Sequence, residues 1–232
     1  MCGIIGCISR ENCYEKLLSS LARLEYRGYD SAGVCLLSDS GTLRLRKKKG
    51  YVSNLAGKPI PGGAGIGHTR WATHGKPSDE NAHPHLCRKF ALVHNGIIEN
   101  YAALKEELLA QGDVFLSETD SEVIVHLLSH AYCGDFLGAL REVCARLCGS
   151  YALAVLCADY PGQIAAARRG SPLVAGAAKG ALYVCSDVPA LCGEAEFLCP
   201  VEDGEFVLLS DAVRVFDGQG RQIERSFTRV KS

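Results

Sequence analysis

No stretch of this sequence approaches the roughly 18 to 20 uninterrupted apolar residues that a transmembrane helix requires. The N-terminus also lacks the basic region, apolar run and cleavage site of a secretory signal peptide. Charge of one sign is not in excess either, since 25 lysines and arginines face 26 aspartates and glutamates, for a formal net charge of −1. Such a balance gives no long-range field that attracts nucleic acid or an anionic membrane. We therefore expect a cytoplasmic protein that binds a small molecule, without a nucleic-acid or membrane partner.

The short spacings of common metal sites are missing as well. The 12 cysteines include no CxxC pair, and the seven histidines form no HExxH motif, although five of them fall between residues 68 and 94. The chain is too long for a small secreted domain framed by disulfides, so we interpret most cysteines as reduced core residues. We expect neither a bound metal nor a cofactor. A cysteine-rich metal-binding protein is the alternative, and it would contain zinc.

Hydrophobic patterns predict strands first, helices next and further strands at the end. Strands are expected at 3–9, 32–37, 42–46, 64–68 and 90–94, and later at 151–157, 163–167, 181–185, 205–209 and 213–216. Helices are expected at 12–25, 100–111, 120–132 and 135–148. This order lacks the regular strand–helix alternation of a parallel sheet, so it indicates an α+β fold. No linker or repeat divides the chain, and we expect one domain over residues 1–232.

Local signals refine this outline at a few positions. Thr119 and Glu122 have the spacing of a capping box, and Asp135 is a candidate N-cap for the following helix. The DGQG at 217–220 predicts a hairpin turn. The basic run RLRKKK at 44–49 is typical of a solvated strand at a sheet edge.

The first candidate for chemistry is Cys2, which follows the initiator methionine. Removal of Met1 would leave a thiol of pKa about 8.5 beside an α-amine of pKa about 7.7 to 8.0. Nucleophile and base would then belong to one residue, because the amine can take the thiol proton and return it to a leaving group. The alternative is that Cys2 is only a small apolar residue at the start of a strand.

The segment HTRWATHG at 68–75 combines groups suited to ligand binding. Arg70 offers a planar donor fork for a carboxylate, and Trp71 can form a wall that excludes water. The alternative is a surface turn whose arginine forms a salt bridge.

Two further segments offer donors and a charge. At the end of VHNG (93–96), the Asn95 amide and the Gly96 backbone N–H could form an oxyanion hole, although an ordinary Asn-Gly turn between strand and helix is the better explanation of this segment alone. In SETDSE (117–122), Asp120 could either begin a helix or hold the ammonium group of a ligand.

Taken together, these segments resemble one family, the class II glutamine amidotransferases. The resemblance rests on Cys2-Gly3-Ile4, EYRGYDSAG at 25–33, HTRWATHG at 68–75, NAHPH at 81–85, VHNGIIENY at 93–101 and SETDSE at 117–122. ARRGSPLVAG at 167–176 and Ser186-Asp187 extend it along the chain. The motifs RGYDSAG, RWATHG and HNGIIEN are similar to those of the glutaminase domains of the glucosamine-6-phosphate synthases within that class.

The resemblance implies a fold and a reaction. The fold would be the four-layer αββα sandwich of the N-terminal nucleophile hydrolases. Cys2 would attack the side-chain carbonyl of L-glutamine and form a thioester while ammonia leaves, and water would then release glutamate. Asn95 and Gly96 would bind the oxyanion.

The resemblance also implies how substrate binds. Arg70 would bind the α-carboxylate of glutamine, and Asp120 would bind its α-ammonium group. Trp71 would lie on a loop that closes over the substrate. The residues implied to line the pocket or to lie beside the nucleophile are Thr73, His74, His83, Arg27 and Gly28.

The length of the chain differs from that of the family's synthases. Those enzymes continue with two sugar isomerase domains, which place the ammonia on fructose 6-phosphate. We therefore expect this chain to hydrolyse glutamine but to lack the acceptor half. Two alternatives stay open: an amidotransferase domain of purine or asparagine synthesis, and a non-catalytic module that binds glutamine.

Overall fold

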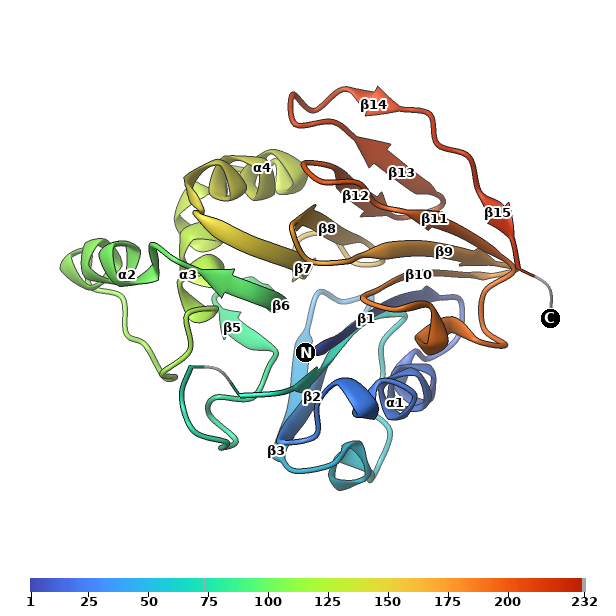
Figure 1. Cartoon of the computed structure of the whole chain (residues 1–232), viewed down its shortest axis with the longest axis horizontal. Coiled ribbons are helices and arrows are strands. Elements are labelled where there is room, and N and C mark those ends of the chain that lie inside the picture. The colour runs from blue at the N-terminus through green and yellow to red at the C-terminus, as the bar shows by residue number, and fades with distance from the viewer. Residues whose placement is uncertain (73, 231–232) are drawn as a thin grey trace.

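The fold is built around two antiparallel β-sheets, seen in the computed structural model of residues 1–72 and 74–230 (Figure 1). Within these residues the first sheet has eight strands, in the order β15 (Thr228–Arg229), β11 (Phe197–Pro200), β9 (Val174–Ala178), β10 (Ala181–Cys185), β1 (Gly3–Ser9), β4 (Ala64–Arg70), β2 (Ser31–Leu37) and β3 (Leu43–Lys49). The second has seven, in the order β14 (Gln222–Ile223), β13 (Val213–Phe216), β12 (Phe206–Leu209), β8 (Ile164–Arg169), β7 (Gly149–Cys157), β6 (Phe90–Ile98) and β5 (His85–Cys87).

Helices cover the outer face of each sheet. α1 (Tyr14–Ala22) packs on the first sheet, α3 (Glu122–Ala131) and α4 (Phe136–Arg146) pack on the second, and α2 (Tyr101–Ala110) packs against α3 (Figure 1). Short 3-10 helices are formed by Glu25–Arg27, Val52–Leu55 and Val188–Leu191. This arrangement confirms the predicted αββα layering.

The alternation of side chains along each strand explains why the layers form. In β1, Ile4 contributes to the core between the two sheets, whereas its neighbour Ile5 contributes to the core under α1. Successive strand residues point to opposite faces, so a strand that is apolar on both faces must be covered on both. β1 therefore lies fully inside the molecule and can position the residue that precedes it.

Most predicted elements are present, and the differences have local causes. The helix predicted over 12–25 ends at Ala22 and is followed by a separate 3-10 turn. Asp135 caps α4 by accepting a hydrogen bond from the Gly138 N–H, as predicted. The hairpin at 217–220 is also confirmed, since it connects β13 to β14.

The predicted capping box at Thr119 and Glu122 is wrong. Glu122 accepts hydrogen bonds from the backbone N–H groups of Leu116 and Ser117, and no side chain caps the N-terminus of α3. The Glu122 carboxylate therefore holds the preceding loop, at residues 116–117, rather than the start of its own helix.

One edge of the first sheet carries the basic run 44–49. β3 pairs only with β2 among the described strands, as the sequence predicts for a solvated edge. In the part of the chain that the structure describes, no helix is long and apolar enough to cross a membrane.

Candidate active site

A small cavity lies where β1, β4 and β6 approach one another between the sheets. Its lining includes seven of the predicted site residues, namely Cys2, Arg70, Trp71, His74, His83, Gly96 and Asp120. His94, Thr119 and Ser121, for which no role was predicted, also line it, whereas Asn95 does not. Larger hollows of about 390 to 520 Å³ lie beyond Ser9, at the other end of β1, but no cysteine or histidine lines them. A further hollow of about 460 Å³ contains Cys133 but none of the predicted site residues, whereas the cavity at Cys2 brings a thiol together with Arg70 and Asp120.

Cys2 is fixed on both sides at the start of β1. Its carbonyl oxygen accepts hydrogen bonds from Arg27 Nε and Asn95 Nδ2, each at 2.9 Å. Its Sγ atom lies 3.3 Å from the Trp71 backbone nitrogen, which donates to it. The thiol thus sits in a defined position with its backbone anchored to both sheets.

Opposing effects act on the Cys2 thiol. Burial raises its pKa, whereas the Trp71 backbone hydrogen bond, the N-terminal charge and Arg70 lower it, and the net result is a raised pKa. A nucleophile in this state needs a base that removes its proton.

The Asn95 side chain is oriented by a buried histidine. His68 Nε2 lies 3.0 Å from Asn95 Oδ1 and 3.1 Å from the His94 carbonyl oxygen. Both partners are acceptors, so Nε2 carries the proton, and Asn95 must direct its NH₂ group away from His68. That NH₂ group reaches the Cys2 backbone, which places one amide donor beside the nucleophile.

Gly96 allows the backbone to pass where a side chain could not. Its φ is +126°, and a Cβ atom at this position would lie 2.1 Å from the Ser150 carbonyl oxygen. Only glycine can adopt this positive φ without strain and also lacks the Cβ atom that would clash with Ser150. The backbone of residue 96 consequently lines the cavity without obstruction.

The Arg70 guanidinium is almost completely buried and only partly paired. Its Nη2 donates to the carbonyl oxygens of His74 and Gly75, at 2.9 Å for the latter. Nη1 lies 3.7 Å from Asp30 Oδ1 and has no hydrogen-bond partner among the described residues. A buried donor in this state is suited to a carboxylate, which accepts hydrogen bonds from a guanidinium with good geometry.

Asp120 provides a negative charge in the same cavity. The side chain lies just before α3, is 4% exposed, and accepts a hydrogen bond from the Ile98 N–H at 2.7 Å through Oδ2. A cation and an anion are thus present on the cavity wall together with a thiol. An α-amino acid carries the two complementary charges.

Two predicted histidines also line the cavity. His83 stacks on His68 with ring centroids 4.2 Å apart, and neither of its ring nitrogens has a partner among the described residues. Burial lowers the pKa of His83 well below its usual range, so the ring is neutral. His74 contacts Tyr101 edge to face, and its Nδ1 is likewise buried without a described partner.

The remaining predicted residues differ in their placement. The Trp71 side chain is half exposed and packs edge to face against Tyr29. Thr73 lies outside the described residues.

The cavity has a volume of only about 20 Å³, close to that of one water, so a larger ligand requires a lining side chain to move.

Arg27 and Gly28 lie beside the nucleophile, as the resemblance implies. Arg27 also forms an ion pair with Asp187 at 2.7 Å, which fixes the guanidinium that holds Cys2. A Cβ atom on Gly28 would lie 2.6 Å from the carbonyl carbon of Arg70. Glycine at 28 therefore lets this turn pack directly against the segment that carries Arg70 and Trp71.

Two further residues, which support the site from outside the cavity lining, carried no predicted role. His68 orients Asn95, and Asp30 accepts a hydrogen bond from the Ala72 N–H while its other oxygen faces Arg70. Both belong to segments that the sequence singled out, at 25–33 and 68–75. Their roles depend on strand pairing, which the motifs alone do not reveal.

Comparison with known proteins identifies a family and several relatives. The sequence profile described as "Glutamine amidotransferase domain" matches residues 68–193. The glutamine–fructose-6-phosphate aminotransferase (isomerizing) of Clostridium tetani is 44% identical over 237 residues, and that of Thermus thermophilus is 48% identical over 237 residues. In both cases the alignment covers 99% of this chain and 39% of the relative. The chain thus spans about two fifths of the length of these curated relatives.

Solved structures share the fold. The glutamine phosphoribosylpyrophosphate amidotransferase from B. subtilis, complexed with ADP and GMP, has a TM-score of 0.82 at 26% identity, over 93% of this chain and 49% of that one. A glutamine aminotransferase class-II domain protein from Silicibacter pomeroyi has a TM-score of 0.63 at 18% identity, over 93% of this chain and 98% of that one. These neighbours and the two antiparallel sheets agree with the N-terminal nucleophile hydrolase fold.

Proposed function

The chain belongs to the class II glutamine amidotransferase family, and from this premise we propose that its cavity hydrolyses L-glutamine to glutamate and ammonia through a thioester on Cys2. The observation that carries the proposal is the joint presence, in one cavity, of the Cys2 thiol, the Arg70 guanidinium and the Asp120 carboxylate. The thiol can attack the side-chain amide of glutamine, and the two charges can bind its α-carboxylate and α-ammonium groups.

The reaction begins at an N-terminal cysteine. Whatever precedes Cys2 must be removed, so that its α-amine is free to take the thiol proton. Sγ then attacks the side-chain carbonyl carbon of glutamine, and the carbonyl oxygen becomes an oxyanion. When the C–N bond breaks, the amine returns the proton to nitrogen, and ammonia leaves. Water attacks the resulting thioester, breaks the C–S bond and releases glutamate.

The oxyanion is stabilised by Asn95 and Gly96. The Asn95 amide has two N–H groups, and the contact with the Cys2 carbonyl uses one of them. The second N–H and the Gly96 backbone N–H are the donors proposed for the developing charge. Removal of one such donor typically lowers the rate by about 100- to 1,000-fold.

Substrate recognition follows from the two charges on the cavity wall. Arg70 Nη1 binds the α-carboxylate, and Asp120 binds the α-ammonium group. His74, His83, Trp71 and Thr73 are proposed to surround the rest of the substrate. The neutral state of His83 suits contact with an uncharged carboxamide chain.

The whole protein is proposed to pass ammonia to fructose 6-phosphate and so make glucosamine 6-phosphate. Support comes from relatives of that name at 44% and 48% identity, compared with 26% for the phosphoribosylpyrophosphate enzyme. Sugar isomerase domains would lie in the portion that this chain does not span. We also propose a cytoplasmic location, because all twelve cysteines are free thiols.

The test is glutamate release from L-glutamine by protein whose N-terminal residue is Cys2, as verified by intact mass. The Cys2→Ala variant should lose turnover completely, because the attacking sulfur is gone. Cys133→Ala is the matched control, since it removes an exposed thiol elsewhere and should retain full activity.

Two results would contradict the proposal. Turnover in Cys2→Ala would show that another group is the nucleophile. Glutamine binding without turnover, measured by calorimetry on folded and correctly processed protein, would instead support the non-catalytic module.

A further inference from the structure

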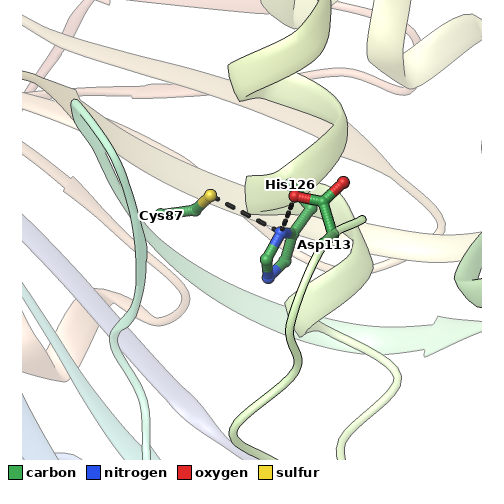
Figure 2. A group of neighbouring side chains, drawn as sticks. All are labelled: Cys87, Asp113 and His126. Atoms are coloured by element: carbon green, nitrogen blue, oxygen red, sulfur yellow. Dashed lines mark hydrogen bonds and ion pairs between the residues drawn. The ribbon is translucent and has the colours of Figure 1, made fainter. Parts of the chain in front are cut away.

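A second group of reactive side chains lies outside the cavity, at the outer face of the second sheet. Cys87 ends β5, Asp113 follows α2, and His126 lies in α3 (Figure 2). Their Sγ, Oδ1 and Nδ1 atoms all lie within 4.8 Å of one another. His126 Nδ1 is 2.9 Å from Asp113 Oδ1 and 3.5 Å from Cys87 Sγ. Three elements that are distant in sequence thus direct one ligand atom each to the same point.

We propose that Cys87, Asp113 and His126 form a binding site for a divalent transition-metal ion of the Zn²⁺ class. Zinc binds thiolate at about 2.3 Å and imidazole or carboxylate at about 2.0 to 2.2 Å, so tetrahedral geometry separates sulfur from nitrogen by about 3.6 Å and nitrogen from oxygen by about 3.3 Å. The observed separations of 3.5 and 2.9 Å are close to these values. Binding requires Asp113 and His126 to separate by a few tenths of an ångström.

The type of ligand selects the class of ion. Thiolate and imidazole suit zinc and its transition-metal neighbours, whereas calcium and magnesium require sets of oxygen ligands. A thiolate and a carboxylate together also balance the charge of a divalent cation. The fourth position would be taken by water, because Cys87 is only half-buried.

The surroundings of the three ligands resemble those of known metal sites. Glu122 Oε1 lies 3.7 Å from His126 Nε2, the ring nitrogen that faces away from the proposed ion. A carboxylate that accepts a hydrogen bond from this nitrogen orients a metal-binding histidine and makes it more basic, and Glu122 lies within about 1 Å of hydrogen-bond distance. His130, one turn further along α3, holds the second oxygen of Asp113 at 2.6 Å. The side chains of His126 and Asp113 are 6% and 7% exposed, so both ligands have fixed orientations.

Protons compete with the ion at this site. His126 Nδ1 lies 2.9 Å from Asp113 Oδ1, which accepts a hydrogen bond, so Nδ1 carries a proton when no ion is bound. An ion must displace the proton on Nδ1, so binding releases protons and tightens as pH rises.

A bound ion would tie the loop after α2 to β5 and α3. Thr119 of the same loop already contacts His85 in β5 at 3.0 Å. Asp120, the proposed ammonium ligand, follows directly. The site is therefore expected to order the segment that leads into the cavity, and not to take part in the glutaminase chemistry.

Cobalt titration tests the proposal, because Co²⁺ bound to a thiolate gives a charge-transfer absorption band that Co²⁺ in water lacks. We expect one equivalent per chain in the unmodified protein and also in Cys2→Ala, which removes the nucleophile as a competing thiolate. Cys87→Ser should lose the band, and Cys133→Ser, which removes an exposed thiol outside the proposed site, should retain it.

A second variant guards against an effect on folding. Asp113→Asn keeps the shape of the side chain but removes a charged ligand. Its affinity for Zn²⁺, measured by competition with a chromophoric chelator, should fall by more than the roughly 10- to 100-fold that removal of an outer hydrogen-bond partner costs. A band that persists in Cys87→Ser, or unchanged affinity in folded Asp113→Asn, would overturn the site. Glutaminase activity is not read in either experiment, so its presence or absence does not affect the result.

Discussion

At the scale of single residues, His68 determines which way the Asn95 amide faces. The ring is fully buried, and burial lowers its pKa to about 3, so it is neutral and donates through Nε2. If the Asn95 amide were reversed, two N–H donors would face each other at 3.0 Å. The orientation of the proposed oxyanion donor is thus fixed by a residue that does not touch the substrate.

Replacing His68 tests this positioning role. His68→Phe should lower kcat for glutamine hydrolysis by about 10- to 100-fold, somewhat less than loss of the donor itself. KM should change little, because Arg70 and Asp120 are untouched. His68→Gln retains an N–H donor and should recover part of the rate. A merely structural role would instead show equal kcat in folded His68→Phe and wild type, or a change confined to KM.

The sequence could predict the residues that face the substrate, but not the residues that hold them in position. Arg70 and Asp120 could be singled out because each is a charged residue in a short polar segment, whereas their burial became visible only in the structure. Asp30 could not be placed, because its contact with Arg70 depends on the pairing of β2 with β4, in which Ser31 lies opposite Arg70. Such a pairing joins residues about forty positions apart and becomes visible only in the folded molecule.

At the scale of elements, β6 shows how a strand can carry a proposed oxyanion donor on its backbone, at Gly96. Gly96→Ala would place Cβ 2.1 Å from the Ser150 carbonyl oxygen in the neighbouring β7 at a φ of +126°. Strain and clash together should lower the free energy of unfolding by more than about 3 kcal/mol.

Gly112→Ala separates these two effects, because Gly112 has a φ of +91° but no atom within 4 Å of the added Cβ. It should cost only the backbone strain, about 1 to 2 kcal/mol. Urea denaturation of both variants measures the difference. Equal losses would show that β6 and β7 move apart enough to accommodate the added Cβ atom, and would contradict the clash predicted here.

The elements that the sequence missed share a physical property. The missed strands β5, β9, β11, β14 and β15 are each two to five residues long. β9 consists of valine, glycine and alanines, which give little alternation of polar and apolar residues. Their stability comes from neighbours across the sheet, and period-two patterns do not record such neighbours. The long helices and the apolar strands β1, β2 and β7 carry their own pattern and were predicted.

At the scale of the whole molecule, the buried histidines make stability depend on pH. Burial and the nearby Lys47 charge lower the pKa of His85 to about 3, compared with about 6.5 in an unfolded chain. Below pH 6.5 the unfolded chain therefore binds a proton that the folded chain does not. Stability is present above this pH and is lost as pH falls.

His85→Gln isolates this contribution. Between pH 7 and pH 5, wild type should lose about 2 kcal/mol more of its free energy of unfolding than the variant does. Denaturant titrations at several pH values provide the measurement, and other histidines act equally in both proteins. Parallel pH profiles for the two proteins would mean that His85 accepts a proton in the folded state.

The basic strand β3 has a consequence for molecules that meet in solution. Its outer edge exposes backbone groups that could pair with a strand from another copy. Two such edges would bring Arg44, Lys48 and Lys49 of one copy against the same cations of the next. Repulsion between like charges opposes that contact, and salt weakens the repulsion. The positive charges on β3 therefore oppose edge-to-edge association between copies of the chain.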